Sequence, residues 1–444
     1  MELAIPRGVR ALMNRLERHG YEAYVVGGCV RDSILGRMPH DWDVTTSALP
    51  HQAMAALEGH RMFETGLQHG TITVLTDDGP VEVTTYRVDG AYSDNRRPDK
   101  VRFTPSLRED LARRDFTINA LAYHPGSGLV DCFGGEEDLR RRLIRCVGDP
   151  DRRFHEDALR ILRGLRFASA LGFSLERHTA DSLTRNRALL GRIASERIRD
   201  ELVGLLCGAG VLPILLDYVP VITQVIPELT PTVGFDQNNP YHIYTVYEHT
   251  AHAVAAVAPR PELRLTMLLH DAGKPATCTE DADGRRHFYG HPKVSAAVAR
   301  EVLHRLRFDN ATIARVVKLV EIHDCNLEPT ERCVLRQLNR LGEEVFRELL
   351  LVKLADNAAQ SEYAQGWTRT VREIEPILER VLTEQRCFSL KDLAVDGTDL
   401  LRAGIPAGPA VGQELQRLLD LVLDGACEND RDALLAQIPQ WKEY

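Results

Sequence analysis

Long apolar stretches and paired cysteines are missing from this chain of 444 residues. No run of 18 or more apolar residues occurs, so we expect no transmembrane helix and no membrane partner. The first twenty residues lack the apolar core and cleavage site of a secretory signal. Nine cysteines are scattered between Cys29 and Cys427 without one Cys-x-x-Cys pair, which argues against a zinc ribbon or a disulfide framework. We therefore expect a cytoplasmic protein with reduced thiols.

An excess of positive charge is also missing from the chain as a whole, which has a formal net charge of −9. The local distribution is different. Between Arg140 and Arg166 the chain carries nine arginines against four acidic residues, an excess of five positive charges. Local charge decides where a polyanion binds, so this strip predicts contact with nucleic-acid phosphates in spite of the acidic total.

The patterning divides the chain into a mixed part and a helical part. β-branched alternation is confined to the first third, whereas helical periodicity dominates from about residue 150 onward. We predict an α+β head with a small mixed sheet and helices, followed by nearly all-α domains. The predicted domains are a head over 1–148, a helical neck over 149–235, a helical domain over 236–360 and a helical tail over 361–444.

The most informative stretch begins at Tyr24. Three residues, Tyr24 to Val26, are typical of the buried end of a strand. Gly27 and Gly28 follow, and they allow the backbone to approach a ligand closely because neither carries a Cβ atom. Arg31 is then within reach of a phosphate group. This order of residues predicts a site for a phosphorylated ligand.

Two aspartates with one residue between them come next. Side chains two apart in a strand share a face, so Asp41 and Asp43 would direct both carboxylates to one point, with Trp42 pointing away. Two hard oxygen donors suit Mg²⁺ carrying a triphosphate. The alternative is that two aspartates beside a turn are solvated or capping groups. Glu82, in a β-branched run that follows a predicted hairpin turn, is a candidate third carboxylate.

A helical pattern covers residues 153–167. Asp157 and Arg160 are three apart, so on one helix they would share a face. Read without any family resemblance, the pair is an ordinary intrahelical ion pair worth a few tenths of a kcal/mol.

The strand, Gly-Gly, Arg and Asp-x-Asp, in this order, resemble the active-site motif of the polymerase-β-like nucleotidyltransferases. With the Val-Arg-Asp tripeptide and the later motifs, the chain is identified as a member of the bacterial (class II) tRNA nucleotidyltransferase and poly(A) polymerase family. The resemblance implies a polymerase-β-like head, Mg²⁺ held by catalytic Asp41 and Asp43, and tRNA, CTP and ATP as partners. The nucleotide-binding residues that it implies are Gly28, Arg31, Arg114, Asp157, Arg160, Arg163 and Arg166.

In this family Glu156-Asp157-x-x-Arg160 corresponds to the nucleotide-selecting motif. An aspartate accepts from an exocyclic amine and an arginine donates to ring acceptors, so the pair can cover the Watson–Crick edge of both cytosine and adenine. Arg113 to Asp115 correspond to the sugar- and phosphate-binding motif. The stretch from Ser195 to Glu201 resembles the motif that steadies the nucleotide-selecting helix.

Two further stretches bear on the product of the reaction. Poly(A) polymerases of the family carry a segment resembling Leu-Leu-Gly-Arg-Arg-Phe after the aspartates, whereas residues 62–75 resemble the CCA-adding version. Residues 87–104 are polar and punctuated by Gly and Pro, so we expect a mobile surface loop, and they resemble the flexible loop that CCA-adding enzymes need when they change from CTP to ATP. Both favour CCA addition, with CC-only addition, A-only addition and poly(A) synthesis as alternatives.

A second constellation lies downstream. His249, His270, Asp271 and Asp356 match the pattern of HD-domain phosphohydrolases, which assigns an HD-type fold to residues 236–360. A lone histidine on an apolar helix is usually a hydrogen-bonded core residue, but an adjacent His-Asp pair that closes an apolar helix is a stronger sign of ligation. His291, in the Tyr-Gly-His-Pro stretch, is a further possible ligand.

His323 is another possible ligand, so the constellation is large enough for two metal ions. Its mixed nitrogen and oxygen donors suit Mn²⁺, Ni²⁺ or Co²⁺ better than Mg²⁺. The alternative from another functional class is therefore an HD hydrolase of nucleotides or cyclic phosphates, with a head that only binds RNA. The intact Asp-x-Asp and Glu-Asp-x-x-Arg motifs argue against it.

Overall fold

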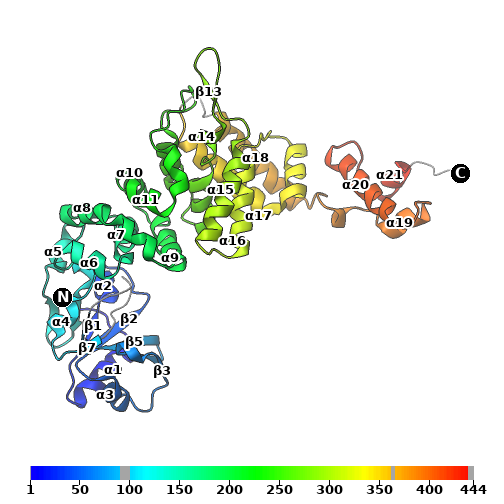
Figure 1. Cartoon of the computed structure of the whole chain (residues 1–444). Coiled ribbons are helices and arrows are strands. Elements are labelled where there is room, and N and C mark those ends of the chain that lie inside the picture. Colours follow the sequence, from blue (N-terminus) through cyan, green and yellow to red (C-terminus); the bar gives the residue numbers. More distant parts are fainter. Residues whose placement is uncertain (1, 91–100, 362–365, 439–444) are drawn as a thin grey trace. The chain divides into compact units, whose positions relative to one another are not determined.

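The computed structural model describes residues 2–90, 101–361 and 366–438 (Figure 1). It consists of two compact units, Met1–Pro227 with Arg305–Phe308, and Glu228–His304 with Asp309–Tyr444. The division into four domains stays a prediction. No helix among the described residues is long and apolar enough to cross a membrane.

The first unit is built on a seven-stranded sheet in the order β3-β4-β5-β2-β1-β8-β9. Its strands are β1 (Ala23–Val26), β2 (Trp42–Thr46), β3 (Met62–Gly66), β4 (Thr71–Thr76), β5 (Gly79–Thr85), β8 (Leu121–His124) and β9 (Gly128–Asp131). Strands β2 and β5 run parallel, and the other neighbours are antiparallel. A mixed sheet with helices confirms the predicted α+β head, including the hairpin of β4 and β5.

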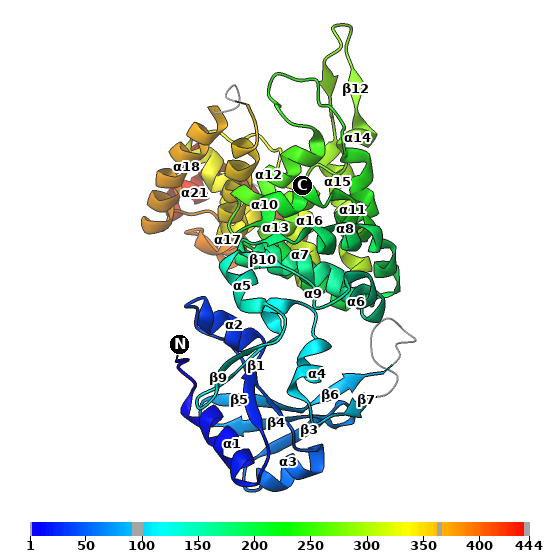
Figure 2. The ribbon, with the colours of Figure 1, turned by 90° about the vertical axis from the view of Figure 1, so that its left-hand side faces the viewer.

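Helices pack onto this sheet through their apolar sides. Helix α1 (Arg7–Arg18) buries Val9, Leu12 and Leu16 and lies beside α3 (Pro50–Ala56) near the sheet (Figure 2). Helix α2 (Gly28–Ile34) starts directly after β1 and contacts β1, β2 and β8. The glycine pair therefore lies where a central strand turns into a helix, which holds the predicted phosphate-binding stretch in a fixed place.

Short helices make up the rest of the first unit. They are α4 (Leu107–Ala112), α5 (Gly135–Arg140), α6 (Pro150–Glu156), α7 (Leu159–Leu171), α8 (Arg177–Arg185), α9 (Ser195–Leu206), α10 (Val211–Asp217) and α11 (Val219–Val225), with β10 (Leu143–Ile144) paired to β11 (Ser174–Leu175). The predicted continuous helix over 153–167 is wrong. Asp157 is extended, with φ −139° and ψ 104°, and separates α6 from α7. Its side chain accepts from the Leu159 amide at 3.0 Å, and this local bond competes with a helical backbone.

The segment 87–104 is not loop throughout. Strands β6 (Arg87–Asp89) and β7 (Val101–Phe103) pair antiparallel at its two ends. Val and Phe in these short stretches favour strand backbone, which the polar character of the whole segment concealed. The remainder of the predicted loop, residues 91–100, lies outside the described residues.

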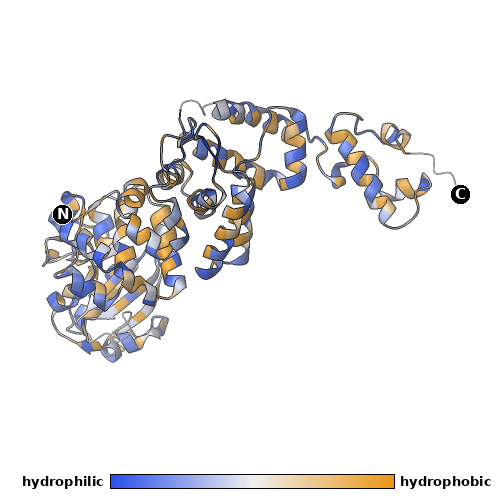
Figure 3. Cartoon of the chain, turned by 45° about the horizontal axis from the view of Figure 1, so that its top comes forward, coloured by the Kyte–Doolittle hydropathy of each residue, from blue (hydrophilic) through white to orange (hydrophobic). Residues whose placement is uncertain are grey.

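The second unit is helical. Its helices are α12 (Val246–Ala256), α13 (Pro261–Leu269), α14 (Lys274–Thr277), α15 (His291–Arg305), α16 (Asn310–Ile322), α17 (Glu331–Ala358), α18 (Gly366–Thr383), α19 (Gly397–Arg402), α20 (Pro409–Leu423) and α21 (Arg431–Ala436), with a small hairpin of β12 (Thr279–Glu280) and β13 (Arg286–His287). Helices α12, α13, α16 and α17 contact one another. Apolar residues recur on single sides of these helices (Figure 3), as amphipathic packing requires.

The last three helices have a core of their own. It consists of Val395, Leu400, Ile405, Leu418 and Leu434. This small apolar cluster agrees with the helical character predicted for the tail.

Candidate active site and metal centre

A cavity of about 500 Å³ lies in the first unit, beside the turn from β1 to α2. Its lining residues are Gly27, Gly28, Cys29, Arg31, Asp32, His40, Asp41, Asp43, Arg114, Asp115, Asn119, Arg163, Arg166 and Phe167. Of the nine residues predicted for nucleotide transfer, seven are in this set. The two others, Asp157 and Arg160, do not line the cavity.

The glycine pair allows the β1–α2 turn to pass close to an arginine. Gly27 has a φ of 84°, which favours glycine, and a Cβ atom there would lie 2.9 Å from Arg114 Nη1. Gly28 is the first residue of α2, so the backbone amides next to it lie at the N-terminal end of a helix. The turn thus leaves backbone and guanidinium donors together at the cavity wall.

Three carboxylates gather at the sheet. Asp43 in β2 is paired in register with Glu82 in the parallel strand β5, and Asp41 directly precedes β2. Burial raises the pKa of Asp43 to about 6; Arg114 lowers this pKa, while Glu82 and Asp41 raise it. A cation at this point would relieve the repulsion among the carboxylates, and oxygen donors are those that Mg²⁺ prefers. The residues present therefore fit Mg²⁺.

Arginines line the same cavity as Asp41 and Asp43. Arg31 donates from Nε to Asp32 at 2.8 Å and from Nη1 to Asn119 at 2.7 Å. Arg163 donates to Asp115 at 2.9 Å. These bonds fix the guanidinium groups in direction, which prepares them for a polyanionic ligand.

One aromatic ring gathers three of the guanidinium groups. The centroid of Phe167 lies 5.1 Å from Cζ of Arg31, 5.3 Å from Cζ of Arg163 and 4.3 Å from Cζ of Arg166. The negative face of an aromatic ring attracts cations, which offsets part of the repulsion among the guanidinium groups. Sequence reasoning missed Phe167, although its place next to Arg166 was a usable signal.

A buried acid contacts two further arginines, one of which lines the cavity. Asp110 is fully buried, accepts from Arg113 Nε at 2.9 Å and lies 3.8 Å from Arg114. It also accepts from Thr45 Oγ1 at 3.2 Å, two residues along β2 from Asp43. Nothing in the sequence distinguishes Asp110 from the exposed acids around it, so sequence reasoning missed this contact.

The predicted base-selecting pair has separate internal partners. Asp157 accepts from Arg197 at 3.0 Å, and Arg197 belongs to α9, which packs against α7. Arg160 donates to Glu156 at 3.0 Å and to the carbonyl oxygen of Arg113 at 2.9 Å. The interpretation as an Asp157–Arg160 ion pair is therefore wrong, since each residue pairs elsewhere.

The second unit holds a compact cluster of histidines and aspartates, which we call the metal centre. Its members are His249, His270, Asp271, His291, His323 and Asp356. Two groups of three can each hold an ion, His249 with His270 and Asp271, and Asp271 with His291 and His323. Asp356 Oδ1 lies 2.9 Å from His249 Nε2 and 3.5 Å from His270 Nε2. The structure thus brings together all four predicted ligands and both additional histidines.

Every histidine of the metal centre is oriented by a backbone carbonyl. The Nδ1 atoms of His249, His270, His291 and His323 lie 3.0, 2.7, 2.8 and 2.7 Å from the carbonyl oxygens of Ala359, Met267, Phe288 and Val320. A carbonyl oxygen only accepts, so each Nδ1 carries a hydrogen, and in the uncharged imidazole each Nε2 then presents a lone pair.

These lone pairs point at one another. His249 Nε2 lies 3.2 Å from His270 Nε2, and His291 Nε2 lies 3.2 Å from His323 Nε2. Two acceptors at this distance need a shared proton or a cation between them. Burial opposes a charged imidazole at His270, but Asp271 and Asp356 outweigh it and raise the pKa of His270 to about 10. The donor set fits two transition-metal ions, one on each side of Asp271.

A buried lysine contacts the metal centre through Asp271. Lys274 Nζ lies 2.7 Å from Asp271 Oδ2 and donates to Gln237 at 2.9 Å. Its place one turn after the His-Asp pair was visible in the sequence, but burial of an ammonium group was not.

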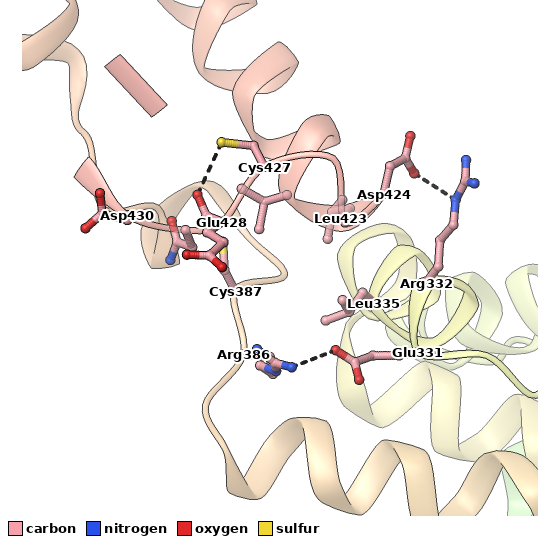
Figure 4. A pocket seen from close by; sticks show the side chains of 13 residues that line it. Glu331, Arg332, Leu335, Arg386, Cys387, Leu423, Asp424, Cys427, Glu428 and Asp430 are labelled. Atoms are coloured by element: carbon pink, nitrogen blue, oxygen red, sulfur yellow. Dashed lines mark hydrogen bonds and ion pairs between the residues drawn. The ribbon is translucent and has the colours of Figure 1, made fainter. Parts of the chain in front are cut away.

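Another hollow of the second unit, of about 510 Å³, lies between α17 and the C-terminal helices (Figure 4). Two of its four acids pair with arginines: Asp424 with Arg332 at 3.0 Å and Glu331 with Arg386 at 3.2 Å. This hollow holds neither of the two metal-binding groups found among the described residues, and we assign it no chemistry.

Three family descriptions match the chain. Residues 23–145 match a Poly A polymerase head domain, residues 172–231 a probable RNA and SrmB-binding site of polymerase A, and residues 288–438 a putative tRNA nucleotidyltransferase domain 2. The first match contains the carboxylates and the glycine turn. The third contains His291, His323 and Asp356.

Curated relatives match over their full length. The chain is 34% identical over 447 residues to the CCA-adding enzyme of Limosilactobacillus reuteri strain DSM 20016. This match covers 98% of this chain and 97% of the relative. It is 31% identical over 434 residues to the CCA-adding enzyme of Bacillus velezensis, covering 98% of each.

Solved structures agree. The CCA-adding enzyme of Bacillus stearothermophilus in complex with CTP superposes with a TM-score of 0.70 at 30% identity, over 96% of this chain and 94% of that one. The Thermotoga maritima CCA-adding enzyme shares the fold at a TM-score of 0.59 and 22% identity, over 97% of this chain and 93% of that one. The chain therefore belongs to the family of CCA-adding tRNA nucleotidyltransferases, as its sequence motifs predicted.

Proposed function

We propose that this protein adds CCA to the 3′ end of tRNA from CTP and ATP, without a nucleic-acid template and with release of pyrophosphate. The observation that carries this proposal is the single cavity that Asp41 and Asp43 line together with Arg31, Arg114 and Arg163. The names of the full-length relatives, and the CTP in the structure that is 30% identical, support the same reaction. tRNA, CTP and ATP occur together in the cytoplasm, where we propose that the protein works.

Asp41 and Asp43 are the proposed catalytic residues and would hold Mg²⁺, with Glu82 as a third carboxylate beside Asp43. When bound, Mg²⁺ supplies Lewis-acid chemistry at the phosphate and neutralises charge. The arginines at the cavity wall would bind the triphosphate, and their existing hydrogen bonds keep them directed at it. Most of the rate enhancement would then come from positioning and charge stabilisation.

Base selection requires Asp157 and Arg160 to leave their present partners and to bind the base instead. Asp157 would leave Arg197 to accept from an exocyclic amine, and Arg160 would leave the Arg113 carbonyl oxygen to donate to the base ring. Cytosine and adenine both offer this combination of donor and acceptor, whereas uracil and guanine do not. The partners in the nucleotide-free protein would keep the polar groups of buried Arg160 and half-buried Asp157 satisfied until a base arrives.

Contact with tRNA is proposed for the neck. The strip between Arg140 and Arg166 has five excess positive charges, and residues 172–231 match a probable RNA-binding site. A polyanion bound there would bring its 3′ end toward the cavity that Arg163 and Arg166 line.

The test is to incubate the protein with a tRNA transcript that lacks CCA, labelled CTP and ATP, and to count nucleotides added. Three nucleotides in the order C, C, A support the proposal. Two cytidines alone, one adenosine alone on a tRNA that ends in CC, or an open-ended adenosine tail would each assign the protein to one of the alternatives: CC-only addition, A-only addition or poly(A) synthesis.

We also propose a phosphohydrolase activity for the metal centre. The observation that favours it is the convergence of four histidine Nε2 atoms and two carboxylates, which suits Mn²⁺, Ni²⁺ or Co²⁺. Such ions supply Lewis-acid chemistry toward a phosphoester. In a protein that acts on RNA ends, a fitting substrate is a damaged 3′ end with a 2′,3′-cyclic phosphate. In this reaction water forms a bond to phosphorus, one P–O bond to the ribose breaks, and the ribose oxygen takes the proton. Conversion of a 2′,3′-cyclic nucleotide to its 2′- or 3′-phosphomonoester, with each metal added in turn, tests this proposal.

A further inference from the structure

A buried amide lies among the charged groups of the head cavity. Asn119 lines this cavity and is 6% exposed. It is the last residue of a single turn of 3₁₀-helix, η2 (Thr117–Asn119), which contacts α2. A buried amide needs partners for both its oxygen and its nitrogen, so the partners of Asn119 indicate what it holds in place.

The two ends of the Asn119 amide contact groups of opposite charge. Its Oδ1 accepts from Arg31 Nη1 at 2.7 Å, and its Nδ2 donates to Asp115 Oδ1 at 3.1 Å. A guanidinium group only donates and a carboxylate only accepts, so both partners require the same orientation of the amide. Burial opposes a charge on Asp115, but Arg163 and Arg160 outweigh it and lower the pKa of this carboxyl to about 2.

Arg31 is thereby held without a second negative charge. Its Nε and Nη2 atoms donate to the two carboxylate oxygens of Asp32 at 2.8 and 2.9 Å, which leaves Nη1 for the Asn119 amide. A carboxylate at this place would also accept from Nη1, but it would repel Asp115 and neutralise more of the charge of Arg31. A neutral acceptor fixes the direction of the guanidinium group and preserves its attraction for a phosphate.

The same amide connects Arg31 to an arginine of α7. Asp115 Oδ2 accepts from Arg163 Nε at 2.9 Å and lies 2.8 Å from Arg163 Nη2. Arg163 lines the cavity together with Arg31. The bonds therefore form a continuous series from Arg31 through Asn119 and Asp115 to Arg163. Asn119 is the uncharged member of this series, and its loss would loosen the arginine at each end.

We propose that Asn119 is a positioning residue for the nucleotide triphosphate, which acts through Arg31 and, by way of Asp115, through Arg163. Asn119 holds both guanidinium groups in the direction in which a triphosphate needs them, and its lack of charge preserves their attraction for the phosphates. The triphosphate is common to CTP and ATP, so binding of both should depend on Asn119 equally. The inference rests on the nucleotide transfer proposed for the same cavity.

The decisive test compares two substitutions of this side chain under mildly alkaline conditions. Asn119→Asp keeps the shape of the amide and the acceptor for Arg31 but adds a negative charge, whereas Asn119→Ala removes both bonds and adds no charge. If Asn119 only filled space, Asn119→Asp would be the milder change. We expect the reverse: Asn119→Asp should raise the KM for CTP and ATP by about a hundredfold and Asn119→Ala by about tenfold, each with kcat within about threefold of wild type.

Two further measurements show whether the effect passes through the arginines. Inorganic tripolyphosphate, which has neither base nor sugar, should lose affinity in both variants by the same factors, measured by calorimetry with Mg²⁺ and without tRNA. In a double-mutant cycle, Asn119→Ala should raise the KM less in an Arg31→Lys background than in wild type, because lysine lacks the planar group that the amide directs. Additive effects in this cycle overturn the proposal.

Ser169→Ala is the matched control for the loss of a buried polar group. The Ser169 hydroxyl is fully buried and donates to the carbonyl oxygen of Leu205 at 2.6 Å, away from the lining of the cavity. This variant should lose thermal stability without a change in KM or in tripolyphosphate affinity. An equal rise of KM in Ser169→Ala, or a larger rise in Asn119→Ala than in Asn119→Asp, overturns the proposal.

The calorimetric measurement also separates this proposal from the proposed reaction. If the wild-type protein transfers no nucleotide but binds tripolyphosphate in a manner that depends on Asn119, the reaction is refuted and the positioning role is retained. If transfer occurs with the wild-type KM in both Asn119 variants, the positioning role is refuted and the reaction is retained. Should Asn119→Ala not fold, Asn119→Asp decides by itself: wild-type affinity for tripolyphosphate would refute the role, and a loss at the melting temperature of Ser169→Ala would support it.

Discussion

The two candidate sites differ in how far their charged and metal-binding groups are arranged before a ligand arrives. In the head, Asp41 and Asp43 stand at an open cavity, and burial with neighbouring carboxylates raises the pKa of Asp43 to about 6. In the metal centre, the histidines are buried and held by backbone carbonyls, so their Nε2 atoms converge before any ion arrives. The proposed nucleotide and Mg²⁺ would therefore complete the head site together, whereas the side chains of the metal centre already converge in the protein alone. Preorganisation of this kind predicts tight metal binding only in the second case.

The largest effect is expected from the head carboxylates. Asp41→Ala or Asp43→Ala should lower incorporation of both CTP and ATP by about a thousandfold or more, since several kcal/mol of charge stabilisation are lost. tRNA binding should stay close to wild type, and so should the transition-metal content of the protein. Asp77→Ala, an exposed acid in the turn between β4 and β5, is the control. Incorporation at the wild-type rate in either aspartate variant would remove that residue from the site.

Substitutions in the metal centre should change the metal content of the protein and not CCA addition. His270→Ala with Asp271→Ala should abolish bound Mn²⁺, Ni²⁺ or Co²⁺ and the thermal stabilisation that these ions give, which is about 2.7 kcal/mol when the free ion is a hundredfold above its Kd. CCA addition should be unchanged. Metal analysis and melting curves with and without EDTA provide the measurement.

Two single variants keep this prediction testable if the double variant folds poorly. His323→Ala should remove one of two ions, because it belongs to one of the two ligand groups. His252→Ala changes a histidine of the same helix as His249 that stacks on Tyr244 and lies outside the ligand groups, so it should retain both ions. A wild-type protein that binds no transition metal under any of these conditions would leave the histidines with a structural role.

A smaller effect is expected at the base-selecting pair. Asp157→Ala removes one half of the contact to the base edge, so it should reduce discrimination against UTP and GTP by about 1–3 kcal/mol. Asp149→Ala, which removes the acid that caps α6, is the control for general disturbance of this region. Single-nucleotide incorporation with each of the four nucleotides decides the matter. An equal loss for all four would mean that Asp157 only supports the α6–α7 junction through Arg197.

Sequence reasoning correctly predicted the local structure around the short motifs. The Gly-Gly turn, the two aspartates and the His-Asp pair have fixed spacings, so their places in a strand, turn or helix follow from local periodicity. It failed at the α6–α7 junction. Asp157 and Arg160 have helical spacing, but the Asp157 side chain bonds to the Leu159 amide and interrupts the helix. Spacing alone cannot distinguish a helix from two helices that meet at a capping residue.

Long-range burial was the second source of error. Asp110 and Lys274 look like surface residues in the sequence, yet Asp110 is fully buried and Lys274 is 5% exposed. Each is stabilised by partners far away in the chain, Asp110 by Thr45 and Lys274 by Gln237. Charged residues are rarely buried without such partners, and the partners become known only when the fold brings them together.

The smallest effect on activity is expected at Phe167. Its ring offsets part of the repulsion among clustered guanidinium groups, and no metal takes part in this. Phe167→Leu keeps an apolar side chain but removes the ring beside Arg31, Arg163 and Arg166. Each cation–π contact is worth about 0.5–1 kcal/mol near a surface, so the guanidinium groups should separate and the KM for both CTP and ATP should rise about threefold to tenfold with little change in kcat. Phe173→Leu is a matched control, because Phe173 is similarly buried and no guanidinium group lies over its ring among the described residues. Both variants should lose similar thermal stability, and only the first should change KM. If Phe173→Leu raises KM equally, the effect comes from loosened packing, and the ring has no separate role in arranging the arginines.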